Sequence, residues 1–131
     1  MSTDWVDYDY AIIRVVPQVH CCAFVNAGVI LHARTAQFLG ARVHLDRDRV
    51  ATLDASTDLD LIERYLNAYR QVCDGEDAGG PIGQLPRSER FHWLTAARST
   101  VLQTSPVHGG RTRNPKRTLD QLFTQYVTPA A

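Results

Sequence analysis

The chain has 131 residues, of which 44% are hydrophobic and 21% are charged, and its 14 Lys and Arg residues are balanced by 14 Asp and Glu residues. This length and composition predict one globular domain over residues 1–131 and exclude a disordered, collagen-like or repeat protein. Because there is no basic excess to neutralise phosphates, a nucleic acid is not the expected partner.

The sequence carries no signal for a membrane, a metal or a cofactor. No apolar run approaches the about 18 residues of a membrane span, and the first ten residues are acidic, so we expect neither a membrane segment nor a signal peptide. The cysteines Cys21, Cys22 and Cys73 suit reduced thiols in the cytoplasm better than disulfides. His20 adjoins two of them, but consecutive residues of an extended chain point in opposite directions, so no metal is expected. Common nucleotide and hydrolase motifs are missing, and we expect no cofactor.

Four segments read as strands. Residues 8–17, 24–33 and 37–45 are rich in β-branched and aromatic residues, the last two being close enough for a hairpin, and residues 99–105 form the fourth. With a period of two, one sheet face collects Ala11, Ile13, Val15, Val25, Ala27, Val29, Leu31, Leu39, Ala41, Val43 and Leu45. The other face is aromatic and polar and collects Tyr8, Tyr10, Ile12, Arg14, Phe24, Asn26, Gly28, Ile30, His32, Phe38, Gly40, Arg42 and His44.

Two main helices accompany these strands. Over residues 58–73 the apolar residues recur at intervals of three and four, and Gly75 suits a left-handed C-cap. A second helix begins at Asn114 as N-cap and Pro115 as first helical residue, with Pro129 just beyond its end. A shorter helix is expected over residues 46–53. The expected fold is α+β, an antiparallel sheet of about four strands with two main helices packed on one face.

The first candidate site lies on the aromatic and polar sheet face. Arg14, Asn26 and Arg42 fall on adjacent strands and converge on an anion or a carboxylate in this interpretation. The alternative is an ordinary solvated or helix-covered face. Aromatic residues beside arginines favour a partner or ligand surface.

The second candidate is the sequence SERFHWL at residues 88–94. In a helical turn Glu89 and His92 are three residues apart, the arrangement that orients an imidazole for general acid or base work. In the structural alternative Ser88 caps a helix, Arg90 pairs with an acid elsewhere, and the apolar residues anchor the segment on the fourth strand. The latter alternative predicts that Trp93 is buried, so that Trp93→Ala costs about 3–5 kcal/mol.

The third candidate is QTSPVHGG at residues 103–110, where hydroxyls, His108 and glycines follow a strand and would cradle a phosphate through backbone N–H groups. The signal is weaker than a P-loop, because no Gly-Lys-Ser/Thr element is present.

Five segments carry a resemblance to a known family. They are YAIIRVVP at 10–17, FVNAGVIL at 24–31, FLGARVHLD at 38–46, GPIGQLPRSERFHWL at 80–94 and RSTVLQTSPVHGG at 98–110. In these segments the chain resembles the bacterial family called domain of unknown function 3037. The resemblance implies, by gene neighbourhood, a HipA-like kinase-domain protein as partner, and it leaves the activity open. The polar residues that match the family's motifs are Arg14, Asn26, Arg42, Glu89, Arg90, His92, Arg98, Ser99, Thr100, Gln103 and His108.

Two functions remain open, and a homo-oligomer is compatible with either. The favoured hypothesis is a binding or regulatory subunit without enzyme activity, whose ligand- or partner-binding residues are Arg14, Asn26, Arg42, Arg90, Arg98, Ser99 and Gln103. The alternative is a small enzyme acting on a phosphate- or carboxylate-bearing substrate, with His92 or His108 as general acid or base and Glu89 orienting. Histidines and arginines in one concave pocket would favour the enzyme, and a flat aromatic surface would favour the subunit.

Overall fold

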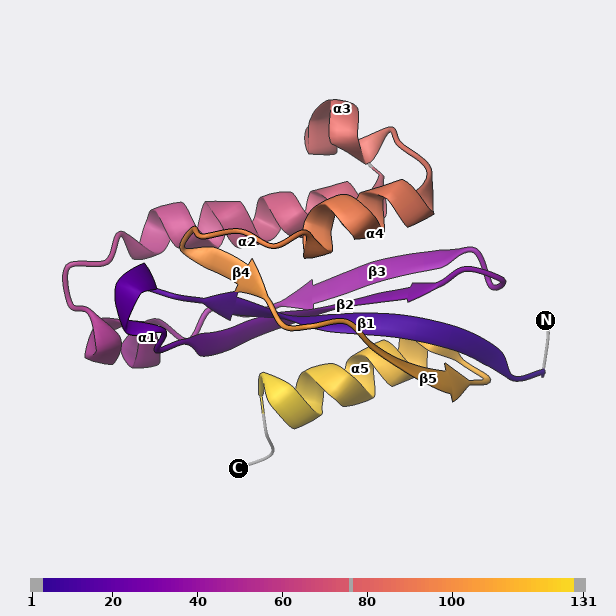
Figure 1. Cartoon of the computed structure of the whole chain (residues 1–131), viewed down its shortest axis with the longest axis horizontal. Helices are drawn as coiled ribbons and strands as arrows, with labels where there is room; N and C mark the ends of the chain where they lie inside the picture. The colour runs from indigo at the N-terminus through magenta and orange to yellow at the C-terminus, as the bar shows by residue number, and fades with distance from the viewer. Residues whose placement is uncertain (1–3, 76, 129–131) are drawn as a thin grey trace.

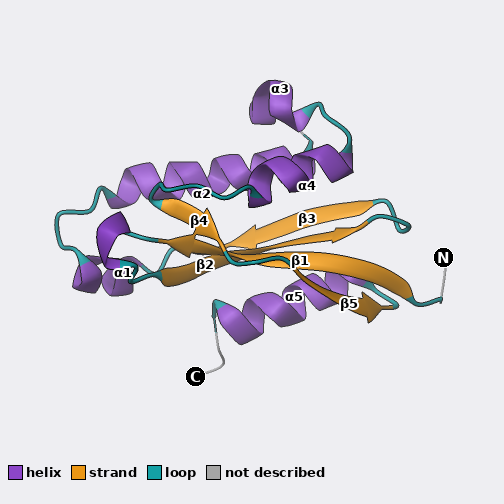
Figure 2. Ribbon diagram, viewed as in Figure 1, coloured by secondary structure: helices purple, strands orange, loops and turns teal. Residues whose placement is uncertain are grey.

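The fold is known from a computed structural model that describes residues 4–75 and 77–128, so Pro129 lies outside the described residues. The strands are β1 (Val6–Val15), β2 (Val25–Ala33), β3 (Phe38–Val43), β4 (Leu102–Thr104) and β5 (His108–Thr112). The helices are α1 (Arg47–Leu53), α2 (Leu59–Asp74), α3 (Gly80–Gly83), α4 (Arg87–Thr95) and α5 (Pro115–Tyr126), with 3-10 turns at Val19–Cys21 and Asp77–Gly79. The prediction of an α+β fold is confirmed (Figures 1 and 2).

The five strands form one antiparallel sheet in the order β3-β2-β1, with β4 and β5 both paired to β1. The two short strands follow each other along the same edge. β4 pairs with Ile13–Val15, and β5 pairs with Val6–Tyr10. The sequence missed β5, which contains Gly109 and Gly110 of the predicted phosphate cradle, so these glycines lie in a strand paired with β1 and not in a loop.

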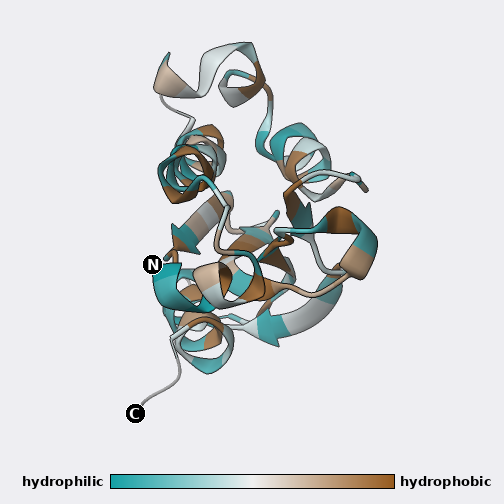
Figure 3. Cartoon of the chain, turned by 90° about the vertical axis from the view of Figure 1, so that its left-hand side faces the viewer, coloured by the Kyte–Doolittle hydropathy of each residue, from teal (hydrophilic) through white to brown (hydrophobic). Residues whose placement is uncertain are grey.

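The two main helices lie on opposite faces of the sheet, so the prediction that both pack on one face is wrong (Figures 1 and 3). On one face α2 and α4 cover a core that includes Ile13, Ile30 and Leu66. On the other face the apolar stripe of α5 packs on Ile12 and Val29. Both faces of the sheet are therefore covered by helices, which is why β2 is buried along almost its whole length.

A β-bulge explains the error. Ile13 pairs with Gly28, but Arg14 pairs with Asn26, which leaves Ala27 as an extra residue in β2. Beyond the bulge the alternation of β2 is shifted by one residue, so Val29 and Leu31 face α5 and Ile30 faces α2. The shifted residues make the second face apolar at its centre, and α5 covers it. In β1 and β3 the predicted faces are confirmed by the two core clusters.

The helix ends follow local capping rules. The Asp58 carboxylate accepts a hydrogen bond from the backbone N–H of Leu61, 3.1 Å away, at the start of α2. Gly75 ends this helix with φ of 71°, the left-handed C-cap expected from the sequence. Asn114 caps α5 by accepting from the N–H of Arg117, and Pro115 takes the first helical position. These caps position both helices against the sheet.

Candidate functional site

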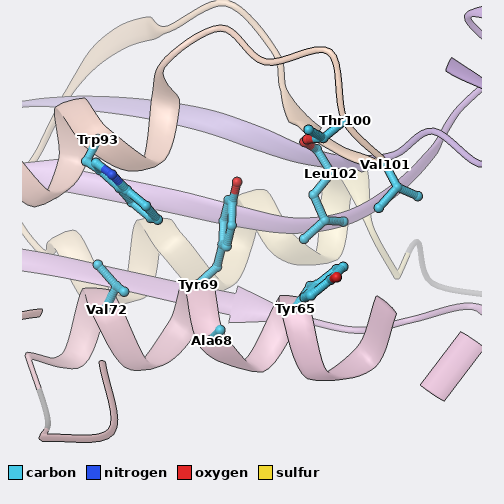
Figure 4. A pocket seen from close by; sticks show the side chains of 8 residues that line it. All are labelled: Tyr65, Ala68, Tyr69, Val72, Trp93, Thr100, Val101 and Leu102. Carbon is cyan, nitrogen blue, oxygen red and sulfur yellow. The ribbon is translucent and has the colours of Figure 1, made fainter. Parts of the chain in front are cut away.

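Two of the cavities among the described residues, one on each face of the sheet, contain candidate site residues or exposed aromatic side chains. The first, which we call the Trp93 groove, has a volume of about 460 Å³ and lies between α2, α4 and the entry to β4. Its lining residues are Tyr65, Ala68, Tyr69 and Val72 from α2, Trp93 from α4, and Thr100, Val101 and Leu102 (Figure 4). The wall is apolar and aromatic, and none of these eight residues is charged.

Two aromatic side chains of the groove are open to solvent. Tyr65 is 44% exposed and Trp93 is 40% exposed, although both lie beside the buried core. The prediction that Trp93 anchors its segment is therefore wrong, whereas its neighbours Phe91 and Leu94 are buried as expected. In an α-helix Phe91 and Leu94 share one face, and Trp93 falls to the side of it. The tryptophan is left to form a wall of the groove.

Arg98 holds the groove wall in shape. Its guanidinium carbon lies 4.6 Å from the centre of the Trp93 ring, and its Nη1 donates to the Tyr69 hydroxyl, 3.0 Å away. Further hydrogen bonds run from Arg98 to the carbonyl oxygens of Trp93 and Leu94. Burial raises the pKa of the Tyr69 hydroxyl although the Arg98 charge opposes this, so the hydroxyl stays neutral and accepts the bond. Arg98 thus acts on the groove as the structural support of two aromatic rings.

The second cavity, which we call the Arg14 pocket, has a volume of about 350 Å³ and lies on the face that α5 covers. It is lined by Tyr10, Ile12, Arg14, Phe24, Asn26, Ser105, His108 and Tyr126, which come from β1, β2 and the residue before it, α5, β5 and the segment between β4 and β5. Three of the predicted site residues, Arg14, Asn26 and His108, therefore meet in one cavity. Gln103 adjoins them, because β1 pairs Arg14 with Gln103 on one side and with Asn26 on the other.

The Arg14 pocket contains polar atoms without partners. The Arg14 Nε and the Asn26 Oδ1 are both buried, and neither has a hydrogen-bond partner among the described residues. The guanidinium of Arg14 stacks 4.3 Å from the centre of the Phe24 ring, and the Asn26 Nδ2 donates to the Tyr126 carbonyl, 3.1 Å away. These contacts orient both side chains while leaving one donor and one acceptor unused.

Aromatic rings form the far end of the Arg14 pocket. The centres of the Tyr10 and His108 rings are 5.6 Å apart. Burial, and then the neighbouring Tyr126 hydroxyl, raise the pKa of Tyr10. The Ser105 hydroxyl is already engaged, since it accepts from the Ile12 N–H and donates to the Pro106 carbonyl. This serine is a structural element of the pocket wall, and Tyr10 is neutral at physiological pH.

The other predicted site residues do not join either cavity as predicted. Arg42 lies on the α5 face but pairs with Asp120, 3.1 Å away, in a bridge whose side chains are 46% and 48% exposed. The side chains of Glu89 and His92 are exposed on α4 and make no hydrogen bond or ion pair with any described residue. Ser99 is exposed in the segment before β4, close in sequence to the groove. The predicted pairing of Glu89 with His92 is wrong.

Arg90 is a structural residue. It is 8% exposed, and its Nη1 donates to the carbonyl oxygens of Val72 and Cys73, each 2.9 Å away, at the C-terminal end of α2. A guanidinium there donates to carbonyls at the end of the helix and is stabilised by the negative end of the helix dipole. The alternative of a pairing with an acid is wrong, and these contacts give Arg90 a structural role in place of the predicted partner contact.

Sequence reasoning missed the residues of α2 that form the groove. Tyr65 does not belong to the apolar stripe predicted for this helix, yet it is one turn before Tyr69. A large aromatic residue off the stripe of an amphipathic helix was the available signal.

Metal and membrane sites are not found in the part of the chain that the structure describes. No three His, Cys, Asp or Glu side chains gather around an ion there, and none of its helices is long and apolar enough to cross a membrane.

Fold and site together define a small α+β protein with helices on both faces of an antiparallel sheet, an open aromatic groove on one face and a polar pocket on the other. The model of the family described as protein of unknown function DUF3037 matches residues 10–127. The chain belongs to this family, as the resemblance of its motifs indicated. No curated protein and no solved structure matches it.

Proposed function

We propose that this protein is a binding subunit that holds an apolar segment of a partner protein in the Trp93 groove. One observation carries the proposal, namely the open aromatic wall formed by Tyr65 and Trp93 over an apolar floor. Exposed aromatic side chains in a preformed apolar cavity are typical of interaction sites, and tryptophan and tyrosine are over-represented among residues that dominate binding energy. Arg98 fixes the tryptophan before binding, which lowers the entropy lost when a partner docks.

The shape of the groove favours a short helix as occupant. Its α2 wall runs from Tyr65 to Val72, which is about two helical turns or about 10 Å. This length accommodates two large apolar side chains spaced by one turn of a partner helix.

The charges near the groove favour an acidic border on the partner helix. Arg98 contacts the groove directly, and Arg64 lies one turn before Ala68 on the exposed side of α2. Two acidic residues of α2, Asp60 and Glu63, are held by Arg47 away from the groove. A partner with carboxylates beside its apolar residues would meet two arginines and no acid.

The partner that we propose is the HipA-like kinase-domain protein implied by the family resemblance. Gene neighbours often act together, and a chain without a recognisable nucleophile and base suits a regulatory or recognition role beside a kinase-like enzyme. The groove supplies the surface that such a partnership requires.

The test measures binding of the purified protein to the neighbouring HipA-like protein by isothermal titration calorimetry. Trp93→Ala and Tyr65→Ala are each expected to weaken binding by about tenfold or more, the scale of an aromatic hot spot. Trp5→Ala is the matched control, because Trp5 is 54% exposed, stacks on Arg113 and lies on β5's side of the molecule. Equal losses in Trp93→Ala and Trp5→Ala, or no binding by the wild type, would overturn the proposal.

A small enzyme is the second candidate, and the observation in its favour is that His108 shares the Arg14 pocket. An imidazole beside an arginine suits acid or base chemistry on a phosphate- or carboxylate-bearing substrate. His92 does not line this pocket. The expected result for an enzyme is that His108→Gln abolishes turnover of a substrate while leaving its binding intact. Turnover that survives in His108→Gln would refute this role.

A further inference from the structure

The Arg14 pocket carries an inference that does not depend on partner docking. We propose that it binds a small amino acid, whose carboxylate pairs with Arg14 and whose ammonium group donates a hydrogen bond to Asn26.

Arg14 has a charge without a counter-ion. The ion pairs of the described residues involve Arg42, Arg47, Arg70 and Arg111, and none involves Arg14. Arg90 is likewise not paired with an acid, but it donates to two helix carbonyls. The Arg14 side chain donates no hydrogen bond to a described residue, and its guanidinium stacks on the Phe24 ring. Leaving a half-buried guanidinium unpaired costs free energy, which an anionic ligand would recover.

Asn26 supplies the second half of the recognition. It sits directly opposite Arg14 in the sheet, on the neighbouring strand, so the two side chains project from the same face. Its Nδ2 is committed to the Tyr126 carbonyl, and this hydrogen bond leaves the Oδ1 as an unpartnered acceptor. A ligand that satisfies both residues must carry an anion and, next to it, a hydrogen-bond donor. The carboxylate and ammonium groups of an α-amino acid have this arrangement.

The charge and size of the pocket narrow the ligand further. No Asp or Glu lines the pocket, so its one permanent charge is that of Arg14. A single planar guanidinium matches a planar carboxylate through two parallel hydrogen bonds, whereas a phosphate dianion calls for more donors. The volume of about 350 Å³ is at the lower end of ligand pockets, which span about 300–1,000 Å³. This space suits a single amino acid.

The walls indicate an apolar side chain on that amino acid. Ile12, Phe24 and Tyr10 present apolar or aromatic surface, and the Tyr10 hydroxyl is kept neutral by its raised pKa. The Ser105 hydroxyl, which would otherwise attract a polar side chain, is engaged with backbone groups on both sides. We therefore expect L-valine, L-leucine and L-phenylalanine to bind more tightly than L-serine or L-aspartate.

The experiment uses the full chain labelled with ¹⁵N and follows backbone amides together with the arginine Nε–H resonances. L-Leucine is titrated as the probe, with isocaproate as the same skeleton lacking the ammonium group, and inorganic phosphate as a separate anion. The expected result is that L-leucine shifts the Arg14 Nε–H and the amides around the pocket, that isocaproate binds more weakly, and that phosphate produces no shift there.

Variants tie the shifts to the two residues. Arg14→Gln is expected to weaken L-leucine binding by about tenfold or more, the effect of losing a charged hydrogen-bonded pair. Arg42→Gln is the matched control on the same sheet face and should bind as the wild type does. Asn26→Ala should bind L-leucine and isocaproate equally, because the acceptor that distinguishes them is gone. Arg14→Lys keeps the charge and checks that any loss in Arg14→Gln does not come from misfolding.

Several results would overturn the inference. They are no shift with any amino acid, equal binding of L-leucine and isocaproate to the wild type, tighter binding of phosphate than of L-leucine, or equal effects of Arg14→Gln and Arg42→Gln. None of these results bears on the Trp93 groove, so a failure here is distinguishable from a failure of the proposed partner binding.

Discussion

Arg90 offers the sharpest test of how the fold holds the groove helices together. It projects from α4 to the C-terminal end of α2 and donates from one nitrogen to the carbonyls of Val72 and Cys73. The proposed perturbation is Arg90→Met, which keeps most of the apolar stem and removes the charge and the donors. The contact joins two helices that are separated in the chain by residues 75–86, so its loss should weaken the packing of α4 on α2.

The expected destabilisation follows from the contacts. Each hydrogen bond from a charged donor is worth about 1.5–3 kcal/mol. The Val72 carbonyl keeps a second partner in the Gly75 N–H, 3.2 Å away, so the Cys73 carbonyl is the one left unpaired among the described groups. Removing the buried charge returns part of its desolvation cost. The free energy of unfolding should therefore fall by about 2–3 kcal/mol. The attraction between the guanidinium and the negative end of the helix dipole, which is also lost, contributes to this value.

The assay is urea unfolding followed by circular dichroism and tryptophan fluorescence. With a slope of about 2 kcal/mol per molar urea, the midpoint of Arg90→Met should fall by about 1–1.5 M. Arg87→Met is the matched control, because Arg87 lies in the same helix and is exposed. A midpoint of Arg90→Met equal to that of Arg87→Met would refute the reasoning and show that the guanidinium contributes nothing net.

Three further predictions use the same unfolding assay. Trp93→Ala should cost about 1–2 kcal/mol, below the about 3–5 kcal/mol of a fully buried tryptophan, because the ring is 40% exposed. Burial lowers the pKa of His32 in the folded chain. As the pH falls below about 6.5, the unfolded chain therefore binds a proton before the folded chain does, and this stabilises the unfolded chain. The urea midpoint should thus drop between pH 7.5 and 5.5. His32→Leu should reduce that drop. Ser105→Ala should cost about 1–3 kcal/mol, because it leaves the buried Ile12 N–H without its partner, whereas Ser99→Ala, at an exposed position, should cost nothing measurable.

The sequence predicted the regular elements because their signals are local. The stripe and the C-cap of α2, and the Asn114–Pro115 start of α5, depend on residues within a few positions of one another. The bulge in β2 was not predictable in this way. Whether Ala27 or a neighbour is the extra residue depends on how β2 pairs with β1, which is a contact between distant parts of the chain. One shifted residue then exchanged the faces of Val29 and Leu31 and gave α5 an apolar surface to cover.

The same difference between local signals and contacts of distant residues explains which candidate site residues were placed correctly. The side chains of β1 and of the part of β2 before the bulge alternate between the two sheet faces, as the sequence predicted. Arg14 and Asn26 were therefore correctly predicted to share a face, and they line one pocket. Glu89 and His92 have a helical spacing that brings side chains together in principle, but their face of α4 is turned to solvent. The role of Arg90 depends on which backbone carbonyls lie opposite it, and nothing in a single sequence reveals that.

The placement of β4 determines how the two proposals should be tested side by side. Successive side chains of a strand point to opposite faces, so Leu102 lines the Trp93 groove while Gln103 lies opposite Arg14. A substitution in β4 would disturb both cavities and would not distinguish the two proposals. Trp93 and Arg14 instead belong to α4 and β1, and their cavities lie on opposite faces of the sheet. Because Trp93→Ala and Arg14→Gln share no contact, their effects on partner binding and on amino-acid binding should be independent. This pair of variants therefore assigns each activity to its own face of the molecule.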